Sequence, residues 1–140
     1  MSDRFFLDTN VLVYALTRSD LSKEAAALRL LTDAIDSGNG IISFQVVQEF
    51  FSLAFRRFIP RLTLVEAERF LAMPLRPLLA IHSSYSLYAQ ALQLTHRHSL
   101  SWYDSLIVAA ALEGDCRILY SEDLQHGQKF DRLRVQNPFL

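Results

Sequence analysis

The sequence predicts a three-layer α/β/α sandwich, in which helices cover both faces of a central, mainly parallel β-sheet. Three observations lead to this prediction. Short apolar segments with strand character alternate with helical segments along the chain. The 140 residues fit one domain, and the hydrophobic share of 51% is enough for a substantial core. No repeat, low-complexity tract or linker divides the chain, so we expect a single domain over 1–140.

The first half of the chain contains two predicted strands and three predicted helices. In order, these are a strand over 4–8, helices over 10–18 and 22–38, a strand over 40–44 and a helix over 44–58. Ser22 is the expected N-cap of the second helix and Gly38 its expected C-cap. In the third helix, apolar residues share one side, and the other side is polar. The polar residues are Gln45, Glu49, Ser52 and Arg56.

The second half continues the alternation. In order, we expect a helix over 63–72, a strand over 77–81, helices over 83–98 and 101–115, and strands over 116–123 and 131–139. Pro74 should end the first of these helices, because proline lacks the amide donor and clashes with the preceding turn. The helix that carries Asp104 has almost no polar face after that residue, so it should be buried.

Composition excludes several classes of protein. Cys116 is the only cysteine, so the chain can form neither an intramolecular disulfide nor a thiolate zinc site. No apolar segment is long enough to span a bilayer, and the N-terminus lacks the basic and apolar regions of a secretory signal. We therefore expect no membrane partner and a cytoplasmic location. The formal net charge of −1 argues against a protein that coats nucleic acid.

Four acidic residues stand out: Asp8, Glu49, Asp104 and Asp123. Each has an ordinary explanation when it is considered alone. Asp8, Asp104 and Asp123 could act as helix caps or turn residues, and Glu49 could be a solvated residue of an amphipathic helix. However, Asp8 and Asp123 both follow predicted strands, and functional groups of parallel sheets gather at the carboxyl ends of strands. The four acids are therefore candidates for one site.

A group of carboxylates without thiolates suits Mg²⁺ or Mn²⁺, which are hard cations that prefer oxygen ligands. Such ions promote hydrolysis of phosphodiesters, because they stabilise the negative charge that builds on phosphoryl oxygens and can lower the pKa of the attacking water. The sequence thus favours metal-dependent chemistry on a phosphodiester.

Four segments, in this order, resemble the motifs of PIN-domain nucleases: FLDTNVLVYAL, the helix with QEF, SWYDSLIVAAAL and LYSEDLQHG. The resemblance extends from Phe5 to about Val135, and SEDLQHG is similar to a form found among bacterial VapC-type toxins. It implies an RNA-cleaving enzyme that uses Mg²⁺ or Mn²⁺. The catalytic and metal-binding residues that it implies are Asp8, Glu49, Asp104 and Asp123.

The resemblance also suggests substrate contacts and a partner. Thr9 and Asn10 match the polar pair that follows the first acid, and either could steady that acid or touch phosphate. Around Glu49 the match is weakest, and Glu66 and Glu68 are the alternatives. A small antitoxin protein is the expected partner, and RNA is the expected substrate.

Two groups of basic residues could hold RNA phosphates beside the metal site, or could simply form solvated basic faces. They are Arg56, Arg57 and Arg61 in the first group, and Lys129, Arg132 and Arg134 in the second. Arg56 is the candidate that we single out for substrate binding.

Alternative functions stay open at this point. The chain could be a housekeeping RNA-processing nuclease of the same fold, or a non-catalytic module that uses its acids to hold a metal or a basic partner. A phosphotransfer receiver would need a lysine on a late strand, and the only lysines are Lys23 and Lys129. The apolar content of the segments 50–58 and 64–75 predicts a homodimer through these helices.

Overall fold

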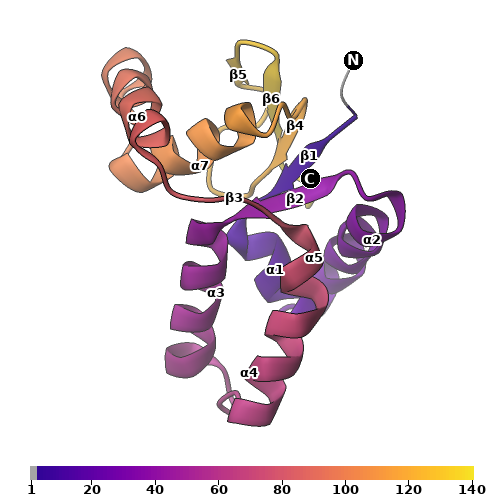
Figure 1. Cartoon of the computed structure of the whole chain (residues 1–140). Helices are drawn as coiled ribbons and strands as arrows, with labels where there is room; N and C mark the ends of the chain where they lie inside the picture. The colour runs from indigo at the N-terminus through magenta and orange to yellow at the C-terminus, as the bar shows by residue number, and fades with distance from the viewer. Residues whose placement is uncertain (1–2) are drawn as a thin grey trace.

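Residues 3–140, the part of the chain that this computed structural model describes, form one six-stranded sheet with helices on both faces (Figure 1). The strand order is β3-β2-β1-β4-β6-β5, and all neighbours are parallel except β5 and β6. The strands are β1 (Phe5–Leu7), β2 (Gly40–Ser43), β3 (Leu79–Ile81), β4 (Ile118–Tyr120), β5 (Lys129–Phe130) and β6 (Leu133–Gln136). The predicted fold class is confirmed.

Strand β1 lies at the centre of the sheet, and the chain changes direction around it. Phe5 is in register with Gly40 of β2 on one side and with Ile118 of β4 on the other. The strands β2 and β3 extend the sheet in one direction, and β4 and β6 extend it in the opposite direction. The carboxyl ends of β1 and β4 therefore form a topological switch point, where open α/β sheets place their functional sites.

The helices alternate with the strands along the chain. They are α1 (Thr9–Leu16), α2 (Leu21–Ser37), α3 (Phe44–Arg57), α4 (Leu64–Phe70), α5 (Arg76–Leu78), α6 (Tyr85–His98) and α7 (Trp102–Glu113), with a π-helical turn over Leu71–Leu75. In Figure 1, α6 and α7 cover one face of the sheet, and α1, α2 and α5 lie on the other. Helices α3 and α4 extend away from the sheet, and the rings of Phe50 and Phe70 join them with centroids 6.0 Å apart.

Of the two predicted caps of α2, the C-cap is confirmed and the N-cap is wrong. Gly38 is the C-cap, with a φ of 72° that favours glycine. The N-cap is Asp20 and not Ser22, because the Asp20 carboxylate accepts hydrogen bonds from the amide (2.9 Å) and the hydroxyl (2.6 Å) of Ser22. The N-cap consequently lies two residues before the expected position, and the helix begins at Leu21.

The segment around Pro74 follows the prediction in outline. Met73 has an extended backbone (φ −157°, ψ 118°) inside the π-helical turn, since the residue before a proline avoids the helical region. The strand expected over 77–81 is shorter, because Arg76–Leu78 still form a helical turn. The two-residue strand β5 was not predicted, because so short a segment carries no period-two pattern.

The buried side of α3 differs from the predicted one. Gln45, Val46, Phe50 and Ala54 are buried, so the buried stripe includes a glutamine that was expected on the polar side. The prediction was wrong here because Gln45 hydrogen-bonds to the backbone of α7, a contact that helical periodicity cannot reveal. Helix α7 is buried from Ser105 to Ala111, as expected. Within the described residues, the helices are all too short or too polar to cross a membrane.

Candidate active site

Asp8 lies at the switch point, directly after β1, and caps α1. Both of its carboxylate oxygens accept hydrogen bonds, from the Thr9 amide (2.7 Å) and from the Ser121 hydroxyl (2.7 Å). Its own amide donates to the carbonyl of Tyr120 at the end of β4 (3.0 Å). The Asp8 side chain is therefore fixed between two strand ends, and the residue is only 6% exposed.

Burial raises the pKa of Asp8 to about 7. The hydrogen bonds from Ser121 and Thr9 oppose this shift, and the nearby carboxylates of Asp123 and Glu49 add to it. A carboxylate in such a position is poorly stabilised as an anion by the protein alone. A cation beside Asp8 would supply the missing stabilisation.

Glu49 lies on α3 and faces the same edge of the sheet. Its carboxylate accepts a long hydrogen bond from the Thr9 hydroxyl (3.5 Å). Burial is the main cause of its raised pKa, to which the charges of Asp123 and Asp104 add, while hydrogen bonds from Gln45 and Thr9 lower it. Glu49 is thus a half-buried residue that interacts with the other acids, and not a solvated residue of an exposed face.

Asp104 lies in the first turn of α7. The Ser101 hydroxyl accepts a hydrogen bond from its amide (3.1 Å), so Ser101 caps this helix and leaves the Asp104 carboxylate available for other contacts. The side-chain amide of Gln45 donates to the backbone carbonyl of Tyr103 (3.1 Å) and thereby joins the start of α3 to the start of α7. Because a helix N-terminus favours negative charge, α7 stabilises an acid or a phosphate at this position.

Asp123 follows β4 in the loop that begins with Ser121. The Ser121 hydroxyl accepts from the Asp123 amide (3.1 Å) and donates to Asp8, so one serine connects the two acids. The side-chain amide of Asn10 donates to the Asp123 carboxylate (3.2 Å). Asn10 therefore contacts one of the expected site acids, and Thr9 contacts another.

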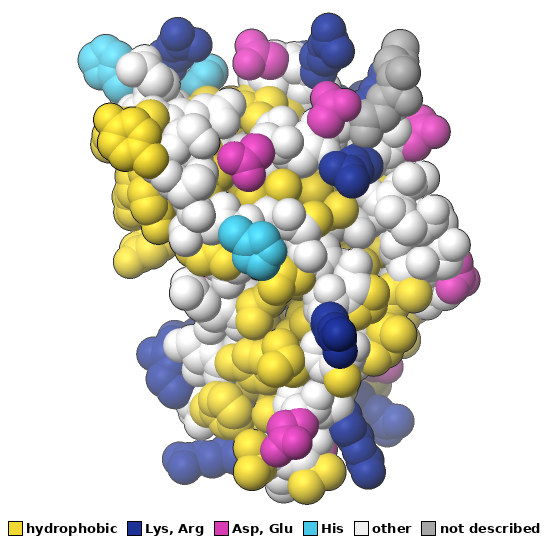
Figure 2. Space-filling model, in the orientation of Figure 1, with side chains coloured by type: hydrophobic (Ala, Val, Ile, Leu, Met, Phe, Trp, Pro, Cys, Tyr) yellow, Lys and Arg dark blue, Asp and Glu magenta, His cyan; other side chains and the backbone are white. Residues whose placement is uncertain are grey.

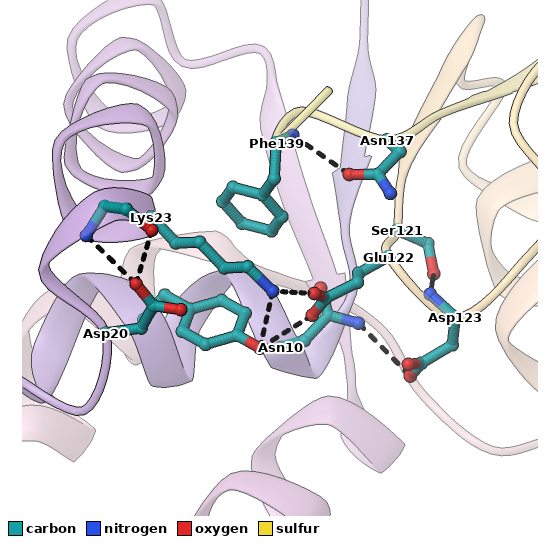
Figure 3. Close-up of polar contacts among 10 residues, drawn as sticks. Asn10, Asp20, Lys23, Ser121, Glu122, Asp123, Asn137 and Phe139 are labelled. Carbon is teal, nitrogen blue, oxygen red and sulfur yellow. Dashed lines mark hydrogen bonds and ion pairs between the residues drawn. The ribbon is translucent and has the colours of Figure 1, made fainter.

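The residue before Asp123 is held by a separate cluster, which Figure 3 shows. Glu122 forms an ion pair with Lys23 of α2 and accepts a hydrogen bond from the Tyr14 hydroxyl (2.8 Å). The Lys23 ammonium lies 4.8 Å from the centroid of the Tyr14 ring and 5.5 Å from that of Phe139. We call Tyr14, Lys23, Glu122 and Phe139 the tether cluster, because they attach the Asp123 loop to α1, to α2 and to the C-terminal segment.

The structure thus brings the four predicted acids to one edge of the sheet, where they interact electrostatically. Within residues 3–140, however, no three carboxylate, imidazole or thiolate groups converge closely enough to form a complete set of metal ligands. The donor chemistry nevertheless fits Mg²⁺ or Mn²⁺, because the available groups are oxygens and Mg²⁺ usually keeps several waters as ligands.

Unsatisfied polar atoms at the same edge of the sheet also favour a cation site. In the described part of the chain, Asn10 Oδ1, Ser43 Oγ and Gln45 Oε1 are buried and have no hydrogen-bond partner. Such atoms normally bind water or a ligand. Together with the poorly stabilised Asp8 carboxylate, they indicate an edge that is suited to hydrated cations.

Several other predicted residues lie elsewhere. Arg56 is exposed at the end of α3, about two turns from Glu49, and its guanidinium donates to the Ser52 carbonyl (3.0 Å). Glu66 and Glu68, the alternatives to Glu49, lie on the exposed side of α4. The second basic group, Lys129, Arg132 and Arg134, does not lie beside the acids. These residues belong to the β5–β6 hairpin and lie where β1 and β4 begin, at the edge of the sheet opposite to the acids.

Two residues of the site were missed by the sequence analysis. Ser121 is fully buried and contacts both Asp8 and Asp123, and Gln45 is buried and orients the start of α7. Ser121 had a readable signal, since it is a polar residue directly at the end of an apolar strand. Gln45 had none, because a polar residue on a helix gives no indication of a tertiary contact.

The chain belongs to the PIN-domain family, whose model matches residues 5–133. No curated protein is similar enough to the chain in sequence to count as a match. Solved structures of toxins and toxin–antitoxin complexes share the fold, at identities of about one residue in five.

Three of these structures illustrate the likeness. The Mycobacterium tuberculosis VapC20, described as a toxin that cleaves the sarcin–ricin loop, is 22% identical with a TM-score of 0.64, over 85% of this chain and 89% of its own. A toxin–antitoxin complex from Klebsiella pneumoniae is 18% identical with a TM-score of 0.65, over 95% of this chain and 96% of its own. VapBC2 from Rickettsia felis, bound to a DNA fragment from its promoter, is 20% identical with a TM-score of 0.62, over 95% of this chain and 97% of its own.

Proposed function

We propose that this protein is a metal-dependent endoribonuclease that hydrolyses phosphodiester bonds of RNA. The observation that carries the proposal is the position of Asp8. It is a buried carboxylate at the switch point of the sheet, with a pKa raised to about 7, and Glu49 and Asp123 lie near enough to add to that shift. Perturbed acids grouped at such an edge are characteristic of functional sites.

Each residue has a distinct role in this proposal. Asp8 and Asp104 are the principal metal ligands, Glu49 completes the site, and Asp123 acts at a greater distance. A bound Mg²⁺ or Mn²⁺ would stabilise negative charge on the phosphate and activate water. Ser121 and Thr9 hold Asp8 and Glu49 in place, and the N-termini of α1 and α7 favour the approach of a phosphate.

The proposal is tested by incubating the purified protein with labelled RNA in the presence of Mg²⁺, Mn²⁺ or excess EDTA. We expect cleavage with either metal and none with EDTA. Asp8→Asn and Asp104→Asn should abolish cleavage while the circular dichroism spectrum stays unchanged. Arg29→Gln is the matched control, because Arg29 is exposed on α2 and has no proposed role in the site. Full activity in EDTA would refute the metal mechanism.

We further propose that the enzyme is the toxin of a toxin–antitoxin pair and acts in the cytoplasm. The support is the likeness to toxins that were solved in complex with their antitoxins. An antitoxin would inhibit by placing a basic or apolar segment over the acidic edge, and an arginine suits this role because its planar fork pairs with carboxylates. Coexpression with the product of a neighbouring small gene tests this proposal. A stable complex that cleaves RNA at the full rate would contradict inhibition by occlusion.

The protein is also proposed to form a homodimer. Helices α3 and α4, the connection between them and the π-helical turn after α4 leave large apolar side chains exposed, and many hydrophobic side chains lie at the surface of this part of the molecule in Figure 2. These side chains are Phe55, Ile59, Leu64, Val65, Leu71 and Met73. A contiguous apolar surface of this kind is usually an interaction surface.

A further inference from the structure

A hollow of about 390 Å³ lies at the edge of the sheet opposite to the acids. It opens where β1 and β4 begin and where the β5–β6 hairpin turns, close to the N-terminus in Figure 1. Five cationic side chains and a single carboxylate are among its lining residues. They are Arg4, Arg117, Lys129, Arg132, Arg134 and Asp3. We call this feature the basic hollow.

The basic hollow contrasts with the rest of the molecule. The formal net charge of the chain is −1, yet cations outnumber acids in this lining by five to one. Figure 2 shows Lys and Arg side chains at the upper end of the molecule, with acidic side chains among them. The concentration of positive charge is therefore local and is not a consequence of a basic composition.

The sheet itself brings the cations together. The Arg117 amide donates to the Arg4 carbonyl, and the Arg134 amide donates to the Arg117 carbonyl, both at 2.9 Å. Arg4 and Arg117 directly precede β1 and β4, and Arg134 lies in the neighbouring β6, so the three residues lie side by side. Lys129 lies directly opposite Arg134 in the antiparallel pair of β5 and β6. Like charges in opposite positions destabilise a sheet, so this pair is unfavourable unless an anion lies between or beside the two side chains.

The three cations of the hairpin are available to a ligand. Lys129, Arg132 and Arg134 are exposed, and no carboxylate within residues 3–140 forms an ion pair with any of them. Arginine and lysine in this arrangement suit phosphate groups, because the guanidinium fork binds phosphate in a bidentate manner and lysine adds a point charge. A hollow with several such groups suits a ligand with more than one phosphate.

We propose that the basic hollow binds the phosphate backbone of RNA at a distance from the acidic edge. The identity of the polymer rests on the proposed ribonuclease function. Arg4 and Asp8 are at the two ends of β1, about 13 Å apart along an extended strand, and they face opposite edges of the sheet. A very short oligonucleotide at the acids cannot also reach the hollow. The hollow therefore selects for folded or long RNA.

The test compares two RNA probes and two matched pairs of substitutions. The first pair, Lys129→Gln with Arg132→Gln, removes two cations from the hollow. The control pair, Arg29→Gln with Arg69→Gln, removes two exposed cations from α2 and α4 and therefore changes the net charge equally. Binding is measured in EDTA, where no cleavage is expected, by fluorescence anisotropy with purified transfer RNA and with a short oligouridine.

We expect the hollow pair to weaken binding of transfer RNA by about tenfold and to lower the slope of log affinity against log salt by about 1 for each cation removed. The short oligouridine contacts fewer cations, so it should bind more weakly than transfer RNA and lose less affinity in the hollow pair. The control pair should have little effect on either probe. The hollow variant should melt at or above the wild-type temperature, because Lys129 no longer opposes Arg134.

Three results would overturn the proposal. The first is an equal loss of transfer RNA affinity in the control pair, which would indicate general electrostatics. The second is an equal loss with the short oligouridine. The third is unchanged transfer RNA affinity in the hollow pair; loss of inorganic pyrophosphate binding in the same variant would then assign the hollow to free phosphates. Cleavage of the oligouridine with Mg²⁺ separately tests the proposed function, so failure of the hollow and failure of the enzyme are distinguishable.

Discussion

Lys23 of α2 forms an ion pair with Glu122, which directly precedes the site residue Asp123. The two residues are 99 positions apart in the chain, and the Tyr14 hydroxyl hydrogen-bonds to the same carboxylate (2.8 Å). The backbone that carries Asp123 is therefore attached on one side to α1 and α2, and on the other to Asp8 through Ser121. This arrangement predicts that Lys23 positions an acid that it does not touch.

Lys23→Met should lower the cleavage rate while RNA binding and the overall fold are retained. The substitution removes the charge that holds Glu122 and keeps much of the apolar stem that packs near the rings of Tyr14 and Phe139. Single-turnover cleavage measures the effect. Arg29→Met, on the same helix, is the control and should cleave like the wild type. Equal rates for the two variants would show that the tether cluster only stabilises the fold.

Ser121→Ala should reduce activity or metal affinity by about 10- to 100-fold. The Ser121 hydroxyl is the only side chain in the described residues that hydrogen-bonds to both Asp8 and Asp123. Its loss leaves the Asp8 carboxylate with one hydrogen bond, from the Thr9 amide, and removes the link between Asp8 and the Asp123 loop. Titration of cleavage against Mg²⁺ concentration measures both quantities. Thr95→Ala removes a different buried hydroxyl contact, to Ser105, and should leave the Mg²⁺ dependence unchanged.

The metal-free protein should lose stability as the pH rises from about 4 to about 7. The pKa of Asp8 is raised from 3.8 to about 7, so the folded state holds this proton more tightly than the unfolded chain. The resulting stabilisation is complete below the unfolded pKa and is lost as the pH rises through the folded pKa. Its size is on the order of a few kcal/mol at most.

Chemical denaturation in EDTA across this pH range measures that loss, with Asp8→Asn as the comparison. The variant has no proton to lose at this position, and asparagine caps a helix nearly as well as aspartate. Its stability should therefore depend less on pH and should exceed that of the wild type above pH 7. Parallel pH profiles for the two proteins would rule out Asp8 as the source.

Mg²⁺ should raise the melting temperature of the wild type at neutral pH, because a ligand that binds only the folded state stabilises it by mass action. The increase should be smaller for Asp8→Asn and for Asp104→Asn, each of which removes one proposed metal ligand. Differential scanning fluorimetry with millimolar Mg²⁺ and with EDTA gives the comparison. An equal increase in all three proteins would place the bound metal outside the acidic edge.

Leu64→Lys with Val65→Lys should convert the proposed homodimer into a monomer without loss of the fold. Both side chains are exposed, at 71% and 59%, so the substitutions do not disturb the core of one copy. Sedimentation velocity at micromolar concentrations gives the oligomeric state. Tyr85→Lys, at an exposed apolar residue on α6, is the control. A wild-type protein that sediments as a monomer at all of these concentrations would refute the dimer.

The sequence was sufficient for the order of the elements because each long helix and each buried strand has its own local pattern. The alternation of apolar strands with helices predicted the parallel sheet. Asp8, Asp104 and Asp123 could be singled out because strand ends and helix starts are readable positions, whereas Glu49 was singled out by the polar side of its helix and by the family resemblance. Gly38 was predictable for the same reason, since a left-handed C-cap has a residue preference.

What could not be predicted depends on contacts between distant segments. Gln45 looked solvent-exposed until the structure placed it against the carbonyl of Tyr103, 58 residues away. The pairing of Lys23 with Glu122 also has no local signature. The hairpin cations follow Asp123 in the sequence, which left open whether they hold phosphates beside the acids or form a solvated basic face. The short antiparallel strand β5 reverses the chain and places them at the other edge.

The separation in sequence of the site acids has a consequence for synthesis of the protein. Asp8 leaves the ribosome early, but its partner Ser121 and the neighbouring Asp123 follow only after more than a hundred further residues. Strand β4, which supplies them, inserts beside the central strand β1, so β1 lacks one neighbour until residues 118–120 emerge. Since chains grow from the N-terminus, the nascent protein cannot assemble its acidic edge before Ser121 and Asp123 have emerged. The ribosome that makes this protein is therefore not exposed to its proposed activity before that point of synthesis.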